Sequence, residues 1–260
     1  MQKIVFITGA TAGFGKACAF KFAAHGYDII INGRRADRLQ QIADELERKF
    51  NTAVLQLPFD VQDEKAVFEA INSIPAEWKA IDVLVNNAGL ALGRDYFDEA
   101  DLSDWNTMID TNVKGFLYVA RAVSQLMAER HTATGAIGHI INMGSIAGRE
   151  VYEKGNVYCA SKFAVDAITR AMRIDLLRHR IKVTSVNPGA AETEFSLVRF
   201  KGDEQTAKKI YDGLQPLSAE DVADAVYYCT TVPTHVCINE LTLTCLQQAN
   251  TIYFDRELVK

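Results

Sequence analysis

Residues 4–15 read IVFITGATAGFG, so a short apolar run leads directly into a glycine-rich turn. The helical pattern that follows stops at Gly26, and glycine is a common helix terminator. A strand, a glycine turn and a helix in this order are typical of a dinucleotide-binding unit, because backbone N–H groups at the turn and at the helix start can hold a phosphate. We therefore expect pyrophosphate to contact Thr8, Gly9, Thr11, Gly13, Phe14 and Gly15. A turn without a ligand is the alternative.

Short β-branched runs and longer helical patterns alternate along the rest of the chain. This alternation predicts an α/β fold, namely a single-domain Rossmann fold over residues 1–260 with a doubly wound parallel sheet of about seven strands and helices on both faces. The expected strands lie near residues 4–8, 28–32, 53–57, 83–85, 138–142, 182–186 and 241–244. The expected helices lie near residues 14–25, 37–50, 64–74, 102–130, 157–178 and 219–231.

Capping residues and one irregular stretch add detail to this predicted order of strands and helices. Asp63 and Ser218 stand where helices should begin, and both residue types are good N-caps. The charged stretch near residues 190–215 lacks strand alternation, so it predicts a flap over the site with a short helix near residues 203–212.

Composition narrows the possible partners and location. The chain has 28 basic and 33 acidic residues, a net charge of −5, which disfavours nucleic acid and membrane surfaces as partners. No apolar run approaches membrane-spanning length and no secretory pattern opens the sequence, so we expect a cytoplasmic protein. The five cysteines form no Cys-x-x-Cys pair and the five histidines are scattered, so we expect neither a disulfide framework nor a catalytic metal.

The end of the second predicted strand reads Asn32-Gly33-Arg34-Arg35. Domains that prefer NAD commonly place a carboxylate here, which would repel a 2′-phosphate. Two guanidinium groups instead suit phosphate oxygens, so we expect NADP as the cofactor. Alternatively, Arg34 and Arg35 only begin a solvated helix.

A second set of residues follows the glycine turn. Tyr158 and Lys162 are four residues apart, so they share one face of a helix. Ser145 follows the fifth predicted strand, and Asn112 lies in the long predicted helix that precedes this strand. These four match the catalytic tetrad of the short-chain dehydrogenase/reductase family, which the chain resembles over nearly its whole length. The ordered motifs are Thr8-Gly-x-x-x-Gly13-x-Gly15, Asn86-Asn87-Ala88-Gly89, Asn112, Ser145, Tyr158-x-x-x-Lys162 and Pro188-Gly189.

The chemistry of that tetrad can be argued from the residue types. Hydride transfer to a carbonyl leaves an alkoxide that needs a proton donor, and the reverse reaction needs a base. Tyr158 is the expected acid/base, and the Lys162 ammonium is expected to lower the pKa of its phenol from about 10. Ser145 is expected to hydrogen-bond the reacting oxygen. Each residue also has an ordinary structural explanation, so the prediction depends on all four meeting in space.

The resemblance implies further contacts and an assembly. It implies that Lys162 also binds the nicotinamide ribose, that Asn112 helps to hold a water relay, and that the protein forms a homotetramer. It also implies cofactor contacts at Asp60, Val61, Asn87, Ala88, Gly89, Pro188, Gly189 and Thr193. Asp60 could instead cap the next helix.

Within the family, the chain is most similar to the NADP-dependent 3-hydroxy acid dehydrogenases, which implies a small substrate such as serine or allo-threonine. The similarity is carried by residues 33–35, 155–158, 193–196 and 198–203. Substrate contacts are expected at Ser145 and Tyr158, and Arg149 and Arg199 are the candidates for binding the carboxylate. Both arginines could instead be solvated surface residues. The turn before Thr193 is one residue shorter than in that group and carries Glu192, which leaves the substrate open. The alternatives are a carbonyl or 3-ketoacyl reductase and a non-catalytic, NADP-sensing binding protein.

Overall fold

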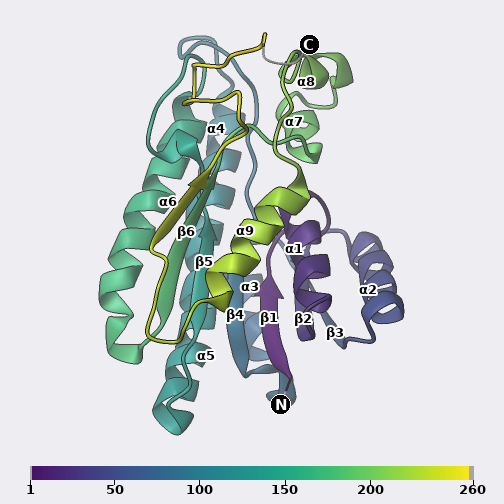
Figure 1. Cartoon of the computed structure of the whole chain (residues 1–260), viewed down its shortest axis with the longest axis vertical. Helices are drawn as coiled ribbons and strands as arrows, with labels where there is room; N and C mark the ends of the chain where they lie inside the picture. Colours follow the sequence, from purple (N-terminus) through teal and green to yellow (C-terminus); the bar gives the residue numbers. More distant parts are fainter. Residues whose placement is uncertain (1, 258–260) are drawn as a thin grey trace.

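The computed structural model describes residues 2–257 and builds them around one parallel sheet (Figure 1). Its seven strands lie in the order β3-β2-β1-β4-β5-β6-β7, and every neighbouring pair is parallel. Their bounds are β1 Lys3–Ile7, β2 Tyr27–Gly33, β3 Val54–Pro58, β4 Ile81–Asn86, β5 His139–Met143, β6 Lys182–Pro188 and β7 Glu240–Leu243. This order reverses between β1 and β4, and it confirms the predicted doubly wound α/β fold.

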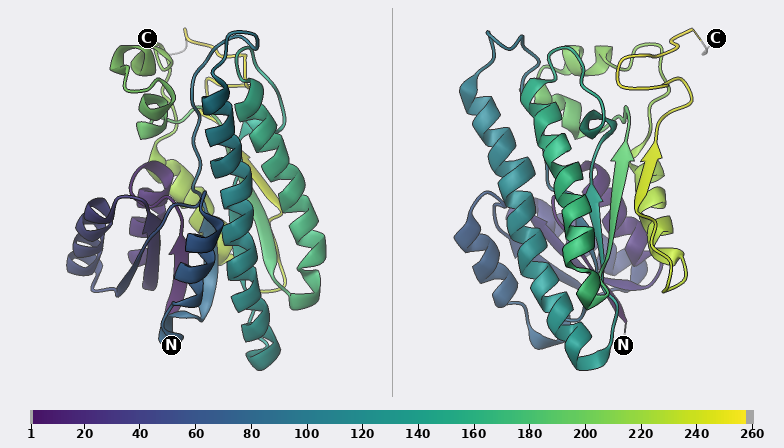
Figure 2. Two further views of the ribbon diagram at one scale, coloured as in Figure 1. Left: turned by 180° about the vertical axis from the view of Figure 1, so that it is seen from behind. Right: turned by 90° about the vertical axis from the view of Figure 1, so that its left-hand side faces the viewer.

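Helices cover both faces of the sheet (Figure 2). α1, α2 and α9 pack on one face, and α3 to α6 cover the other. The helices are α1 Gly13–Ala23, α2 Ala36–Phe50, α3 Glu64–Asn72, α4 Leu102–Ile109, α5 Phe116–Thr134, α6 Asn156–Asp175, α7 Glu194–Arg199, α8 Glu204–Lys209 and α9 Ala219–Thr231. Short helical turns also occur at Ala76–Trp78, Asp110–Gly115, Ile146–Gly148 and Leu177–His179.

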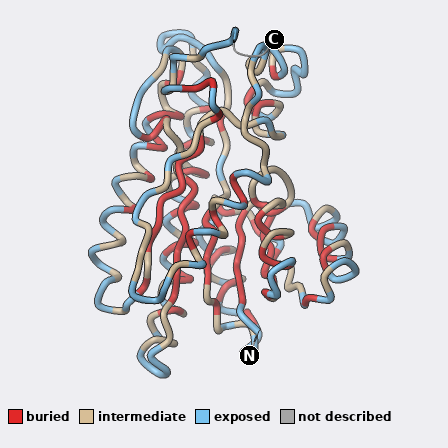
Figure 3. Tube along the Cα trace, in the orientation of Figure 1, coloured by how far each residue is buried: buried red, intermediate tan, exposed pale blue. Residues whose placement is uncertain are grey.

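The five inner strands β2, β1, β4, β5 and β6 are mostly buried on both faces because each face has its own helical layer, whereas the edge strands β3 and β7 are more exposed (Figure 3). Along β1, Val5 and Ile7 enter the core on one side, whereas Ile4 and Phe6 enter the core on the other. This period of two explains why the sequence reads as continuous apolar runs rather than as an alternating pattern.

Most predicted boundaries lie within a few residues of the observed ones, with two corrections. The predicted helix 102–130 is interrupted by the π-helical turn Asp110–Gly115, at which Asn112 bonds to Leu90 and Gly115 lies against Val61. The predicted helix 157–178 ends at Asp175 and continues only as a 3-10 turn.

Side-chain caps fix several helix starts at the edge of the site. The predicted caps Asp63 and Ser218 are confirmed, since each accepts a hydrogen bond from the first turn of its helix. In the flap, Asp203 caps α8, which confirms the predicted short helix, and Thr193 caps the unpredicted α7. None of the described helices combines the length and apolar character needed to cross a membrane.

Candidate active site

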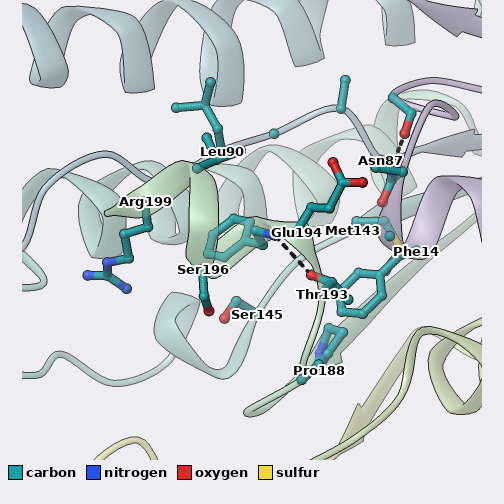
Figure 4. A pocket seen from close by; sticks show the side chains of 18 of the residues that line it. Phe14, Asn87, Leu90, Met143, Ser145, Pro188, Thr193, Glu194, Ser196 and Arg199 are labelled. Carbon is teal, nitrogen blue, oxygen red and sulfur yellow. Dashed lines mark hydrogen bonds between the residues drawn. The ribbon is translucent and has the colours of Figure 1, made fainter. Parts of the chain in front are cut away.

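A cavity of about 590 Å³ opens at the carboxyl ends of the strands, where doubly wound sheets bind their ligands. It runs from Arg34 and Asp60, at the predicted adenosine end, to Tyr152 and Arg199, at the predicted substrate end. Figure 4 shows Phe14, Asn87 and Thr193 around one part of this space, and Ser145, Ser196 and Arg199 around another.

The glycine turn has the geometry expected of a phosphate-binding loop. Gly9 and Gly13 adopt positive φ values of 65° and 51°, which favour glycine. Gly15 permits a close approach, because a Cβ there would lie 2.3 Å from the carbonyl oxygen of Gly9. Within the described chain, Ala12 gives α1 no side-chain cap, so the first N–H groups of α1 stay available for an anion.

Most of the predicted cofactor residues line this cavity, although two lie behind it. The lining includes Gly9, Thr11, Gly13, Phe14, Arg34, Arg35, Asp60, Val61, Asn87, Ala88, Gly89, Pro188, Gly189 and Thr193. Thr8 and Gly15 do not line it. Instead, the Thr8 hydroxyl accepts hydrogen bonds from the backbone N–H groups of Asn87 and Ala88, each 2.9 Å long, and so joins the ends of β1 and β4.

Both predicted arginines stand at the adenosine end with their side chains in solvent. Arg34 pairs with Asp60 at 3.5 Å, and Arg35 donates to the Thr11 hydroxyl at 3.0 Å. Asp60 accepts from the backbone of Gln62 and does not cap α3. Two guanidinium groups beside an uncapped helix start fit a dinucleotide with a 2′-phosphate.

Tyr158 and Lys162 project from α6 toward the end of β5. Each is nearly buried, and the Lys162 ammonium lies 6.0 Å from the centre of the Tyr158 ring. Lys162 Nζ donates to the carbonyl of Met143 at 2.9 Å, which leaves two of its three donors for a ligand. Ser145 Oγ accepts from the backbone of Ala147, so its own O–H is free to donate into the cavity. The sequence-predicted groups Ser145, Tyr158 and Lys162 therefore meet in one place.

The expected lowering of the Tyr158 pKa was wrong for this arrangement. Burial raises the pKa of the phenol well above its usual value, and the opposing effects of the Ser145 hydroxyl and the Arg199 guanidinium are smaller. Burial also lowers the pKa of Lys162 to about 8. The phenol is thus protonated at neutral pH and can act as a proton donor.

Asn112 lies behind the cavity rather than in its wall. Its amide oxygen accepts from Leu90 N at 2.8 Å, and its amide nitrogen donates to Leu90 O and to the Ser161 hydroxyl. These bonds join the π-helical turn to α6 and to the loop that follows β4. The water relay implied by the family resemblance stays a prediction.

The two candidate arginines have different surroundings. Arg149 pairs with Asp166 at 3.0 Å and with Glu240 at 2.8 Å, and it does not line the cavity. Arg199 does line it, is only 9% exposed, and donates to the Tyr152 hydroxyl at 2.9 Å and to a backbone carbonyl. Its guanidinium carbon lies 5.5 Å from the centre of the Tyr158 ring.

Sequence reasoning missed a group of wall residues at the substrate end, namely Tyr152, Glu194, Ser196, Tyr211, Gln248, Thr251 and Phe254. They come from loops, from the short helix α7 and from the segment after β7, where hydrophobic periodicity gives little signal. Glu192 stands out in the sequence as an acidic group near the site. Its side chain does not line the cavity. Among the described residues, no cluster of three His, Cys, Asp or Glu side chains could hold a metal ion.

The chain was compared with known proteins and structures. It is 46% identical to sulfoacetaldehyde reductase 2 of Chromohalobacter salexigens over 251 residues, 96% of each chain. It is 47% identical to an NADP-dependent 3-hydroxy acid dehydrogenase of Escherichia coli, over 95% of this chain and 96% of the relative. The closed form of a serine dehydrogenase complexed with NADP⁺ superposes with a TM-score of 0.88 at 46% identity, covering 95% of this chain and 96% of that one.

The family model for short chain dehydrogenases matches residues 3–203, which include the glycine turn and all four tetrad positions. That span exceeds half of the chain, and it agrees with the parallel sheet and with the meeting of Ser145, Tyr158 and Lys162 at its edge. The chain therefore belongs to the short-chain dehydrogenase family.

Proposed function

We propose that this protein is an NADP-dependent oxidoreductase that transfers a hydride between the cofactor and a small 3-hydroxy acid such as serine or allo-threonine. The main support for this proposal is the environment of the Arg199 side chain. A nearly buried guanidinium stands beside Tyr158, and no carboxylate within residues 2–257 forms an ion pair with it. A buried cation normally requires an anionic partner, so a substrate carboxylate is the natural counter-ion.

Each side chain at the substrate end of the cavity has a separate role in the reaction. The Ser145 O–H donates to the substrate oxygen, Tyr158 Oη exchanges a proton with that same oxygen, and Arg199 holds the anionic end. The Lys162 ammonium stabilises negative charge that develops on the phenol and presents two donors to ribose hydroxyls. When bound, NADP supplies the hydride acceptor or, in the other direction, the hydride donor.

The test compares two arginine variants across acidic and neutral substrates. With NADP⁺, Arg199→Ala should raise KM for L-serine, allo-threonine and 3-hydroxypropionate by roughly 10- to 100-fold and change KM for a simple alcohol much less, because one charged hydrogen-bonding group is lost. Arg149→Ala is the matched control, since it removes a guanidinium that pairs with Asp166 and Glu240 outside the cavity. Equal losses on acids and alcohols in Arg199→Ala would contradict the proposal.

The same panel separates the alternatives. Preference for neutral carbonyls or acyl substrates would identify a carbonyl or 3-ketoacyl reductase, and tight NADP binding without turnover would identify a cofactor sensor. One relative is named a sulfoacetaldehyde reductase, and a guanidinium can bind a sulfonate as well as a carboxylate. A small sulfonate aldehyde is therefore the second candidate substrate, and it belongs in the panel.

We further propose that the protein is cytoplasmic and forms a homotetramer. Five free cysteines are compatible with a reducing compartment. Exposed apolar side chains on α5 and α6, namely Leu117, Phe163 and Ile174, support self-association. Light scattering of the purified protein tests the assembly, and a monomer at micromolar concentration would contradict it.

A further inference from the structure

The segment after β7 folds back over the cavity as a compact loop, residues 245–256, which we name the C-terminal strap (Figure 1). Gln248 and Phe254 form an antiparallel bridge inside it, and Ala249 N donates to Tyr253 O. Gln247 and Gln248 are each only 5% exposed. Buried glutamine amides need hydrogen-bond partners, and these two find theirs in the strap and in the walls of the site.

Side-chain hydrogen bonds hold the strap to the turn after β6 and to the end of the flap. Gln248 Oε1 accepts from Ala190 N at 2.7 Å, directly after the predicted cofactor residues Pro188 and Gly189. Gln247 accepts from Gln215 N at 2.7 Å and donates to Gly213 O at 2.8 Å.

Two further contacts join the strap to the loop after β5 and to the end of α8. The Glu150 carboxylate accepts from both N and Oγ1 of Thr251, each at 3.1 Å, and Glu150 lies five residues after Ser145. The Arg256 guanidinium donates to the carbonyls of Ile210 and Asp212. The strap is thus fixed to every loop that surrounds the reacting centre on the β5 and β6 side.

Only some side chains of the strap reach the cavity. Gln248, Thr251 and Phe254 line it, next to Ile210 and Tyr211 of the flap. The Arg256 guanidinium lies over the Phe254 ring at 5.4 Å, which limits how far the ring can turn away. By contrast, Ile252 and Tyr253 are 69% and 68% exposed.

We propose that the strap limits substrate length, with Phe254 and Thr251 as the residues that determine specificity. The inference rests on the proposed function, in which Ser145 and Tyr158 take the reacting oxygen and Arg199 takes the anion. The remaining group on the reacting carbon then faces the strap. A hydrogen or methyl group leaves room for a phenylalanine ring that Arg256 holds in place, whereas a propyl group would clash with it. The protein therefore selects short 3-hydroxy acids.

The test measures kcat/KM for 3-hydroxypropionate, 3-hydroxybutyrate and 3-hydroxyhexanoate in the full-length protein and its variants. One methylene group in an apolar pocket changes kcat/KM by roughly 10- to 200-fold. Phe254→Ala should therefore raise the ratio for 3-hydroxyhexanoate over 3-hydroxypropionate at least about tenfold. Tyr253→Ala, an equal truncation at the exposed neighbour, should leave the ratio at the wild-type value.

The outcomes separate this inference from the proposed function. A ratio that is the same in Phe254→Ala and Tyr253→Ala would overturn the inference, even where wild-type turnover of the acids supports the function. Turnover of neutral alcohols alone would refute the acid substrate, and the ratio for 1-hexanol over 1-propanol would then test the length limit in the same variants. Phe254→Leu and Thr251→Ala repeat the measurement if Phe254→Ala fails to fold, which its thermal melting curve shows.

Discussion

The two ends of the cavity are built in different ways. At the end predicted to hold the cofactor, the cavity walls come mainly from residues directly after β1, β2, β3 and β4, with Gly9 and Gly13 in conformations that favour glycine. At the substrate end, the walls come from the loop after β5, the flap and the strap, joined by side-chain bonds such as that from Ala190 N to Gln248. A short motif therefore specifies the cofactor end, whereas scattered long-range contacts specify the substrate end.

The largest expected effect lies where the two ends meet. Tyr158→Phe removes the acid/base group and should lower kcat by about 10²- to 10⁴-fold, while the Kd for NADPH stays near the wild-type value. Stopped-flow rates and NADPH fluorescence titration measure the two quantities. Tyr152→Phe is the control, because its hydroxyl contacts Arg199 and its loss should raise KM for the acid rather than lower kcat. Normal turnover by Tyr158→Phe would remove the proposed mechanism.

A smaller effect should be confined to the cofactor end. Replacing both Arg34 and Arg35 by alanine should raise the Kd for NADPH about a hundredfold and leave the Kd for NADH unchanged, since both lost groups are expected to bind the 2′-phosphate. Arg48→Ala, at the far end of α2, is the matched charge control. An equal loss for both cofactors would show that the arginines act on something other than that phosphate.

The smallest effect concerns the sheet that supports both ends. His139 is buried on β5 against the Thr184 hydroxyl, and burial lowers its pKa to about 3 from the usual 6.5. The unfolded chain therefore binds a proton below pH 6.5 that the native chain does not bind, so this stability is present above pH 6.5 and is lost as the pH falls toward 3. His139→Gln should reduce the loss of unfolding free energy between pH 7 and pH 5 by about 2 kcal/mol in urea titrations.

The His235→Gln variant provides the reference for that titration, because it makes the same substitution at an exposed position. If both variants show the wild-type pH dependence, the buried histidine does not contribute.

The same contrast explains what could be predicted from the sequence. Apolar runs and caps such as Asp63 placed all seven strands and most helices, because these signals are local. The tetrad positions Ser145, Tyr158 and Lys162 could be brought together by helix spacing and strand ends alone. The direction in which the Tyr158 pKa is shifted could not be predicted, since it depends on burial of the phenol and on the nearby Tyr152 hydroxyl, and no local sequence pattern encodes either.

The sequence alone also could not show which of Arg149 and Arg199 faces the cavity. Both follow site motifs, but Asp166 and Glu240, which pair with Arg149, come from α6 and β7. The strap was missed for the same reason, because Gln247 is joined to the flap through Gly213 and Gln215, which lie more than thirty residues away in the sequence. The interrupted helix at Asn112 reflects tertiary bonds to Leu90 that outweigh local helix preference.

The solvent exposure of Arg34 and Arg35 has an evolutionary consequence. Surface positions accept most substitutions at a cost within about 0.5 kcal/mol, so mutation can exchange these residues without disturbing the interior. Preference for the phosphorylated dinucleotide can thus weaken through substitutions at these two surface positions alone. A new substrate demands coordinated replacements in segments far apart in the gene, and cofactor preference should diverge first.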